Sequence, residues 1–188
     1  MEQVIILGAG TMAQEVTDLI NDIGQDEVVG YCVNQGWKKD LTLLGKKVYY
    51  VDDLIYWLDR AKVIRAIFSP ESYGFIKKVE NMGFDFTSVI HPSASISKSA
   101  KIGKGVIVNR LVAIGYGTVI SSHCLINRGC TIGHHCFLEE GVTLGPGVNI
   151  AGNVQVGKRT LIGMGSNVIQ NAIIGSNRRI RANSLVLK

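Results

Sequence analysis

Residues 126–154 read INRGCTIGHHCFLEEGVTLGPGVNIAGNV, and an aliphatic residue recurs at every sixth position of this stretch. Stepping by six in both directions extends the pattern over most of the C-terminal half. The sixteen positions, all aliphatic, are Ile96, Ile102, Val108, Ile114, Ile120, Ile126, Ile132, Leu138, Leu144, Ile150, Val156, Ile162, Val168, Ile174, Ile180 and Val186. A fixed period of this kind is typical of repeat architectures, whose units are stable only when they stack on one another.

Two further features share the six-residue period. Glycine often follows the aliphatic residue, as at Gly133, and a small or β-branched residue stands four positions after it, as at Val148; Arg178 is the clear departure. Each hexapeptide is therefore expected to form one short strand and a turn, and three hexapeptides to close a triangular coil of 18 residues. The pattern predicts an all-β, left-handed parallel β-helix of about five coils over residues 91–188, with the aliphatic side chains inside.

Three of the four cysteines, Cys124, Cys130 and Cys136, fall on the small interior position of the repeat. We expect them to be packing residues and not metal ligands, and no metal site is predicted. No CxxC pair is present, so the thiols are expected to be free in a reducing compartment. The start of the chain does not resemble a signal peptide, and no apolar run approaches the roughly 20 residues that span a membrane. These observations favour a cytoplasmic location.

Residues 1–90 lack the repeat and alternate between apolar runs and amphipathic segments. This alternation predicts a separate Rossmann-like α/β domain with a small parallel sheet. The expected strands are 4–7, 28–33, 47–50, 63–68 and 87–90, and the expected helices follow the first glycine turn, cover 52–58 and run from Ser69-Pro70 to about Met82.

The first turn, Gly8-Ala9-Gly10-Thr11-Met12-Ala13, matches the pattern GxGxxA between a strand and a helix. Such a turn directs backbone N–H groups and a helix N-terminus towards a phosphate, although a tight turn alone would also explain the glycines. A dinucleotide site would also need an acidic residue at the end of the second strand, where Val33 and Asn34 stand. A nicotinamide-dependent dehydrogenase is therefore disfavoured.

Charge is distributed unevenly along the chain. Residues 1–95 carry nine Lys/Arg against thirteen Asp/Glu, whereas residues 96–188 carry eleven Lys/Arg against two Asp/Glu. The basic half indicates an anionic partner or simply a solvated basic surface. Nucleic acid fits less well than a phosphorylated small molecule such as coenzyme A, because the basic residues are scattered and few aromatic residues lie among them.

The order of a 90-residue α/β domain, the junction His91-Pro92-Ser93-Ala94 and uninterrupted hexapeptides resembles the sialic acid O-acetyltransferase family. That family includes N-acetyltransferases that act on nucleotide-linked amino sugars. The stretches 126–136 and 146–154 carry the resemblance most specifically. It implies a homotrimer, acetyl-CoA as co-substrate between adjacent β-helices, and a sugar nucleotide on the N-terminal domain. The candidate contacts to that sugar substrate are Gly8, Gly10, Thr11 and Asn34.

The resemblance also assigns catalytic roles. His134 would be the general base that takes a proton from the attacking amine or hydroxyl, and the N–H of Gly152 would stabilise the acetyl carbonyl. Apart from the resemblance, Arg178 and Arg179, together with Arg181, could bind the phosphates of CoA as bidentate donors; a solvated basic terminus explains these arginines equally well. The family usually has an acidic residue directly after this histidine, where this chain has His135; a second cation there would lower the basicity of His134. A turn residue without a catalytic role is the alternative for His134.

The leading hypothesis is therefore an acetyl-CoA-dependent sugar N- or O-acetyltransferase without a nucleic-acid or membrane partner. One alternative is a catalytically degenerate trimer that serves as a binding or scaffold protein. Another is an acetyltransferase for a non-sugar acceptor, because the N-terminal turn lacks several of the polar residues that are usual in the family.

Overall fold

The structure, a computed structural model, describes residues 1–37, 40, 42–67 and 72–187. The chain forms two compact units, Met1–Thr87 and Ser88–Lys188. The sequence placed this boundary after residue 90. The difference arises because strand β6 (Val89–Ile90) pairs in parallel with β9 (Ile107–Val108), so that β6 belongs to the first coil of the second unit.

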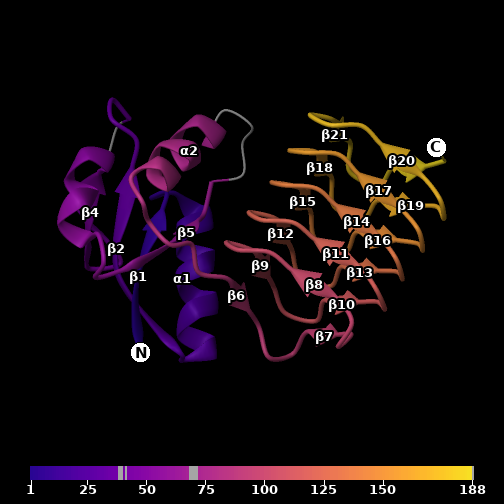
Figure 1. Cartoon of the computed structure of the whole chain (residues 1–188), viewed down its shortest axis with the longest axis horizontal. Coiled ribbons are helices and arrows are strands. Elements are labelled where there is room, and N and C mark those ends of the chain that lie inside the picture. Colours follow the sequence, from indigo (N-terminus) through magenta and orange to yellow (C-terminus); the bar gives the residue numbers. More distant parts are fainter. Residues whose placement is uncertain (38–39, 41, 68–71, 188) are drawn as a thin grey trace. The chain divides into compact units, whose positions relative to one another are not determined.

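The first unit contains a five-stranded sheet in the order β3-β4-β2-β1-β5 (Figure 1). All neighbouring strands in it run parallel except β3 and β4, which are antiparallel. Its elements are β1 (Glu2–Leu7), α1 (Thr11–Ile23), β2 (Asp26–Val33), β3 (Thr42–Leu43), β4 (Lys46–Tyr50), the 3-10 helix η1 (Val51–Trp57), β5 (Lys62–Arg65) and α2 (Tyr73–Asn81). The predicted parallel sheet is thus present.

Helices cover both faces of this sheet. On one face, Thr17 of α1 lies with its Oγ1 atom 2.8 Å from the hydroxyl of Tyr31 in β2. On the other face, side chains of η1 and α2 pack against β1, β2 and β5. That buried cluster comprises Ile5, Leu7, Cys32, Val51, Leu54, Val63, Phe75, Ile76, Val79, Phe84 and Phe86. With both faces covered, the central strands are continuously apolar, as β1 is over its last four residues.

Two expectations for this unit are corrected, and a third lies partly outside the described residues. The helix expected over 52–58 is a 3-10 helix. The strand expected over 87–90 is shortened to β6 and leaves the sheet, where only Phe86 makes an isolated parallel bridge to Val63. The α2 helix begins at Tyr73. Residues 68–71, which include the end of the predicted strand 63–68 and the start of the predicted helix, lie outside the described residues.

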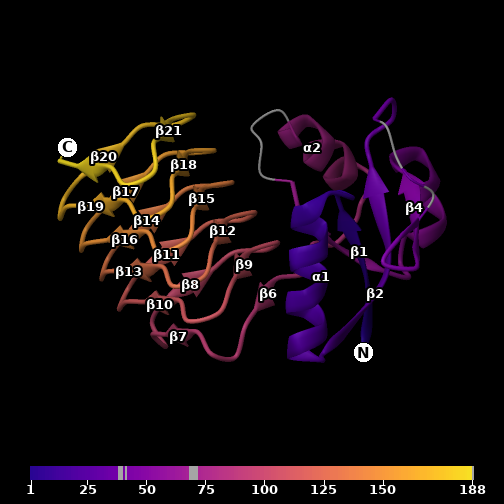
Figure 2. The same ribbon diagram turned by 180° about the vertical axis from the view of Figure 1, so that it is seen from behind.

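The second unit is a parallel β-helix of three sheets whose coils stack along one axis (Figures 1 and 2). One sheet holds β7 (Ser95–Ile96), β10 (Ala113–Ile114), β13 (Thr131–Ile132), β16 (Asn149–Ile150), β19 (Asn167–Val168) and β22 (Leu185–Val186). The second holds β8 (Lys101–Ile102), β11 (Val119–Ile120), β14 (Phe137–Leu138), β17 (Gln155–Val156) and β20 (Ile173–Ile174). The third holds β6, β9, β12 (Leu125–Ile126), β15 (Thr143–Leu144), β18 (Leu161–Ile162) and β21 (Arg179–Ile180).

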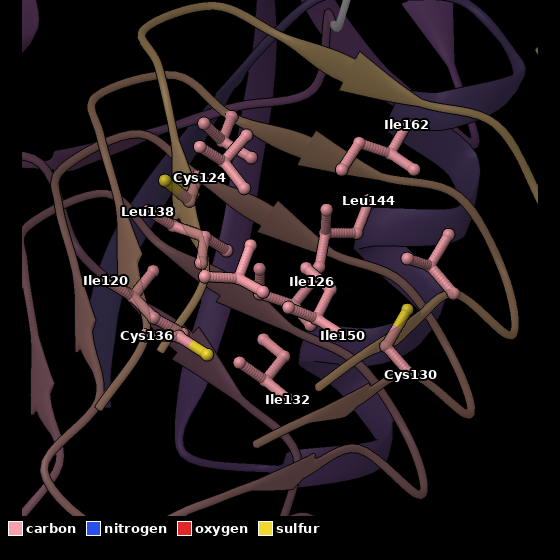
Figure 3. Close-up of a cluster of buried hydrophobic side chains, with 14 of the residues drawn as sticks. Ile120, Cys124, Ile126, Cys130, Ile132, Cys136, Leu138, Leu144, Ile150 and Ile162 are labelled. Atoms are coloured by element: carbon pink, nitrogen blue, oxygen red, sulfur yellow. The ribbon is translucent and has the colours of Figure 1, made fainter. Parts of the chain in front are cut away.

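The register of these sheets follows the sequence period. Ile132 of β13 pairs with Ile114 in the coil before and with Ile150 in the coil after, which are each 18 residues away. Equivalent side chains therefore stack directly on one another inside the coils. Figure 3 shows aliphatic side chains from all three sheets inside the coils, with Cys124, Cys130 and Cys136 beside them.

Hydrogen bonds from the small interior residues connect one coil to the next. The thiol of Cys136 donates to the carbonyl of Ala151 at 3.0 Å, and the hydroxyl of Thr118 donates to the carbonyl of Gly133 at 2.7 Å. Cys124, Cys130 and Cys136 are each at most 1% exposed, and all four cysteines are free. The prediction that these three cysteines pack in the core is confirmed. Within the described ranges, no helix is long and apolar enough to cross a membrane.

Candidate active site

His134 lies in the turn that joins β13 to β14, at one of the three corners of the β-helix. The stacking of coils places Tyr116 before it and Gly152 after it at the same corner. Backbone hydrogen bonds fix this stack, because the N–H of His135 donates to the carbonyl of Tyr116 at 2.8 Å and the N–H of Asn153 donates to the carbonyl of His134 at 2.9 Å. Both histidine side chains are exposed to solvent.

The imidazole of His134 lies over the Cα atom of Gly152. A Cβ atom at Gly152 would stand 2.6 Å from both Cε1 and Nε2 of the ring, which is far inside van der Waals contact. Only glycine therefore leaves room for this placement of the imidazole. The sequence arithmetic that put these two residues one coil apart is confirmed, while their catalytic roles remain a hypothesis.

The backbone of Gly152 offers a hydrogen-bond donor beside the imidazole. Its carbonyl accepts from the N–H of Asn171 at 3.1 Å, but its own N–H donates to no acceptor that the described part of the chain provides. Gly152 is a buried residue. A backbone N–H that has no acceptor within the described chain can donate to an oxygen atom of a ligand.

His135 contacts the other side of the His134 ring. The two Nδ1 atoms are 3.1 Å apart, and the ring centroids are 5.3 Å apart in an edge-to-face arrangement. At this distance one nitrogen donates and the other accepts, so at least one of the two imidazoles is neutral in this arrangement. The sequence expectation treated His135 only as a second cation and did not anticipate this hydrogen bond.

Nearby carboxylates have other contacts. Glu139, five positions after His134, accepts a hydrogen bond from the backbone N–H of Lys158 at 2.9 Å. That bond belongs to the corner between β14 and β15, whereas His134 lies at the corner between β13 and β14. His135 is therefore the side chain that the structure places against His134 Nδ1.

Arg178 and Arg179 are not brought together with His134 within one chain. Arg178 directly follows the turn after β20, and Arg179 begins β21, so that both lie near the corner between the second and third sheets. Both arginines are exposed.

The first unit contains a pocket of about 510 Å³ at the carboxyl ends of β1, β2 and β5. Gly8, Gly10 and Thr11 line it, as does Met12 at the start of α1. Asn34 follows the lining residue Val33 but does not itself line the pocket. Gly8 has a φ of +127°, and a Cβ atom there would stand 2.8 Å from Cγ1 of Ile67, so this position requires glycine.

Several lining residues of this pocket were not predicted, among them an aromatic and an acidic side chain. Trp37 and Asp40 lie in the segment between β2 and β3 and reach the pocket beside the glycine turn. Trp37 is 38% exposed and contacts Phe75 edge to face, with ring centroids 5.6 Å apart. The available signal was an aromatic and an acidic residue within seven positions after the second strand, whereas the dinucleotide pattern has its acid directly at the strand end.

Comparison with solved structures shows similarity to sugar acetyltransferases. The chain is 29% identical to PerB from Caulobacter crescentus, solved in complex with CoA and GDP-perosamine, with a TM-score of 0.91 over 100% of this chain and 90% of that one. A mutant of perosamine N-acetyltransferase from the same organism, also solved with CoA and GDP-perosamine, gives 28% identity and a TM-score of 0.89 over the same shares.

More distant structures support the fold alone. The acetyltransferase domain of PglB from Neisseria gonorrhoeae is 22% identical, with a TM-score of 0.87 over 100% of this chain and 92% of that chain. No protein-family model and no curated protein matches the sequence. The structural neighbours are thus hexapeptide-repeat acetyltransferases, and the stacked parallel sheets of the second unit fit their left-handed β-helix fold.

Proposed function

We propose that this protein is an acetyl-CoA-dependent acetyltransferase that acylates the amine of a nucleotide-linked amino sugar, with His134 as general base. The observation that carries the proposal is the corner at which the His134 imidazole lies over Gly152, next to a backbone N–H without an acceptor in the described chain. The similarity to PerB over the whole chain supports acetyl-CoA and a sugar nucleotide as the two substrates.

In the proposed reaction, the sugar amine attacks the thioester carbonyl, and Nε2 of His134 accepts the proton that the amine loses. The Gly152 N–H donates to the carbonyl oxygen as negative charge develops on it. The C–S bond then breaks, and CoA leaves as a thiol after taking up a proton. General-base catalysis of this kind typically raises the rate 10²–10⁴-fold, and one oxyanion donor lowers the activation free energy by about 3 kcal/mol. Loss of either group should therefore lower the rate by a factor of about 10² or more.

We further propose that the first unit is a Rossmann-like domain whose pocket binds the nucleotide. The pocket lies where the carboxyl ends of β1 and its neighbours meet the start of α1, which is where doubly wound sheets bind phosphates. Gly8, Gly10 and Thr11 would face the diphosphate. Trp37 offers a face for the base, and Asp40 offers a carboxylate for the ribose hydroxyls. Asn34 would contribute from just beyond the pocket.

We propose a homotrimer with acetyl-CoA bound between copies, as in the sialic acid O-acetyltransferase family that the sequence resembles. Phe137 and Ile173 support association, because both point outward from the second sheet and are 40% and 67% exposed. Association would also allow Arg178 and Arg179 to reach a CoA phosphate at a neighbouring copy. Because thiols such as those of the free cysteines persist in reducing compartments, we place the reaction in the cytoplasm.

The proposal is tested with the purified full chain and acetyl-CoA. Release of CoA would be followed with GDP-perosamine and a panel of UDP-, dTDP- and CMP-linked amino sugars as acceptors. We expect turnover with at least one of them and a loss of on the order of 10²-fold or more in His134→Ala. His91→Ala, at the first coil, is the matched control and should keep full activity.

Two outcomes would contradict the proposal. Full activity of His134→Ala would show that His134 is not the general base. Binding of acetyl-CoA without turnover for any acceptor would favour the scaffold alternative. Light scattering measures association separately: we expect three times the chain mass of 20.4 kDa, both for the wild type and for His134→Ala.

A further inference from the structure

The residue after the proposed base is held in one defined place. The backbone of His135 has a φ of 55°, a conformation that costs most side chains free energy. Its ring lies over Gly117, where a Cβ atom would stand 3.0 Å from the ring Cδ2 atom. The ring of Tyr116 packs against it edge to face, with centroids 5.5 Å apart. The preceding coil thus makes room for the His135 imidazole and supports it.

This placement points Nδ1 of His135 at Nδ1 of His134, at 3.1 Å. Only one proton fits between two nitrogens at this distance. If His134 donates, its Nδ1 carries the proton and its Nε2, on the side of Gly152, keeps a free electron pair. If His135 donates instead, His134 carries its proton on Nε2 and cannot accept one there. The direction of this hydrogen bond therefore decides whether His134 can be a base.

We propose that His135 is a positioning residue: its Nδ1 accepts a hydrogen bond from His134 and holds His134 in the Nδ1–H tautomer. In this role a neutral imidazole orients the base as a carboxylate would, without adding charge. The tautomer of a histidine is set by the partner of its second nitrogen, which here is a nitrogen atom of His135. The contact between the two nitrogens is independent of the proposed function, whereas the choice of His134 as the donor rests on it, because a base needs a free electron pair on Nε2.

The chain offers well-matched substitutions for the test. Asn153 and Leu111 occupy the same left-handed position in other turns, both with φ of 58°, so that Asn and Leu are both compatible with this backbone. The Oδ1 atom of an asparagine occupies nearly the same place as Nδ1 of a histidine. His135→Asn therefore keeps an acceptor for His134, and His135→Leu removes it at similar size.

The first measurement is ¹⁵N NMR of the imidazoles in the full-length protein without substrate, at about pH 8, where free histidine is neutral. His134→Ala and His91→Ala spectra assign the signals. We expect a protonated Nδ1 and an unprotonated Nε2 for His134 in the wild type and in His135→Asn. In His135→Leu we expect a shift to the Nε2–H form. A wild-type His134 protonated on Nε2 would overturn the proposal.

The second measurement is kinetic and uses acetyl-CoA with the acceptor found active above. His135→Leu should lower kcat on the order of 10²-fold with little change in KM for acetyl-CoA, while His135→Asn stays within a few-fold of the wild type. If His134→Ala remains active, the proposed function fails but the NMR result stands. If His134 is essential but His135→Leu keeps the Nδ1–H tautomer of His134 and the wild-type kcat, the proposed function stands and only the role of His135 is refuted.

Discussion

The imidazole of His134 occupies the space that a side chain at Gly152 would fill, since a Cβ atom there would stand 2.6 Å from two ring atoms. Gly152 is therefore required for a reason beyond its backbone N–H. The glycine lets the imidazole of one coil lie directly against the backbone of the next coil.

We expect Gly152→Ala to displace the ring of His134 and to lower kcat by about 10²-fold, while the free energy of unfolding changes by less than about 1 kcal/mol. The fold should tolerate the methyl group because the clashing atoms belong to a movable side chain. Gly175→Ala is the control, since a Cβ atom there would come no closer than 3.7 Å to its neighbour Arg178. In a His134→Ala background, Gly152→Ala should cause almost no further loss; a full additional loss would show that the two residues act independently.

The glycines that follow the aliphatic residues are predicted to be structural. A Cβ atom at Gly133 would stand 2.7 Å from backbone atoms of Ala151 and Gly152, which cannot move aside. Gly133→Ala should destabilise the protein by about 2–3 kcal/mol in urea unfolding. By contrast, Gly129 has open space and a φ of +67°, so Gly129→Asn should change stability by less than about 0.5 kcal/mol. Equal effects of the two changes would contradict the stacking argument.

The buried thiol of Cys130 predicts a loss of stability in alkali. Burial raises the pKa of Cys130 from 9.0 to about 11. In the unfolded chain the thiol ionises first, so ionisation favours unfolding as pH rises from the unfolded pKa to the folded one. The wild type should therefore lose up to about 3 kcal/mol relative to Cys130→Ala between these two pKa values, and nothing below them. A constant difference between the two proteins would contradict this prediction.

Nucleotide binding in the first unit should be visible by fluorescence. Trp37 lines the pocket, whereas Trp57 belongs to η1 and does not. We expect GDP or another nucleoside diphosphate to quench the fluorescence of Trp57→Phe but not that of Trp37→Phe. Asp40→Asn should weaken binding by roughly 10-fold or more, because it removes a charged acceptor from the ribose hydroxyls. Quenching that survives in Trp37→Phe would place the nucleotide elsewhere.

The β-helix could be predicted from sequence because its main rule is local: an aliphatic residue every six positions predicts both the strand and its inward face. The same period correctly placed Cys130 in the core and Gly152 one coil after His134. The role of Val89 and Ile90 could not be predicted, since pairing with β9 depends on which neighbour offers a free strand edge and not on composition.

The details of the candidate site could not be predicted from the sequence. The hydrogen bond between His134 and His135 depends on two side-chain rotamers and on the space left by Gly117, which the repeat does not encode. Trp37 and Asp40 line their pocket together with residues that are distant in the sequence, such as Gly8 and Ile67. Residues that come together through tertiary structure rather than through a period leave no regular signal.

The constant register of the coils has a consequence for how the second unit folds. Neighbouring strands always join residues that are 18 positions apart, as Ile114 and Ile132 do, however many coils the chain contains. The entropy lost on closing each loop is therefore the same from the first coil to the last, unlike in most β proteins, where the longest loop limits the rate. Once two coils have paired, each further one adds at the same entropic cost, so the β-helix is expected to grow like a zipper, and its folding rate should depend little on its length.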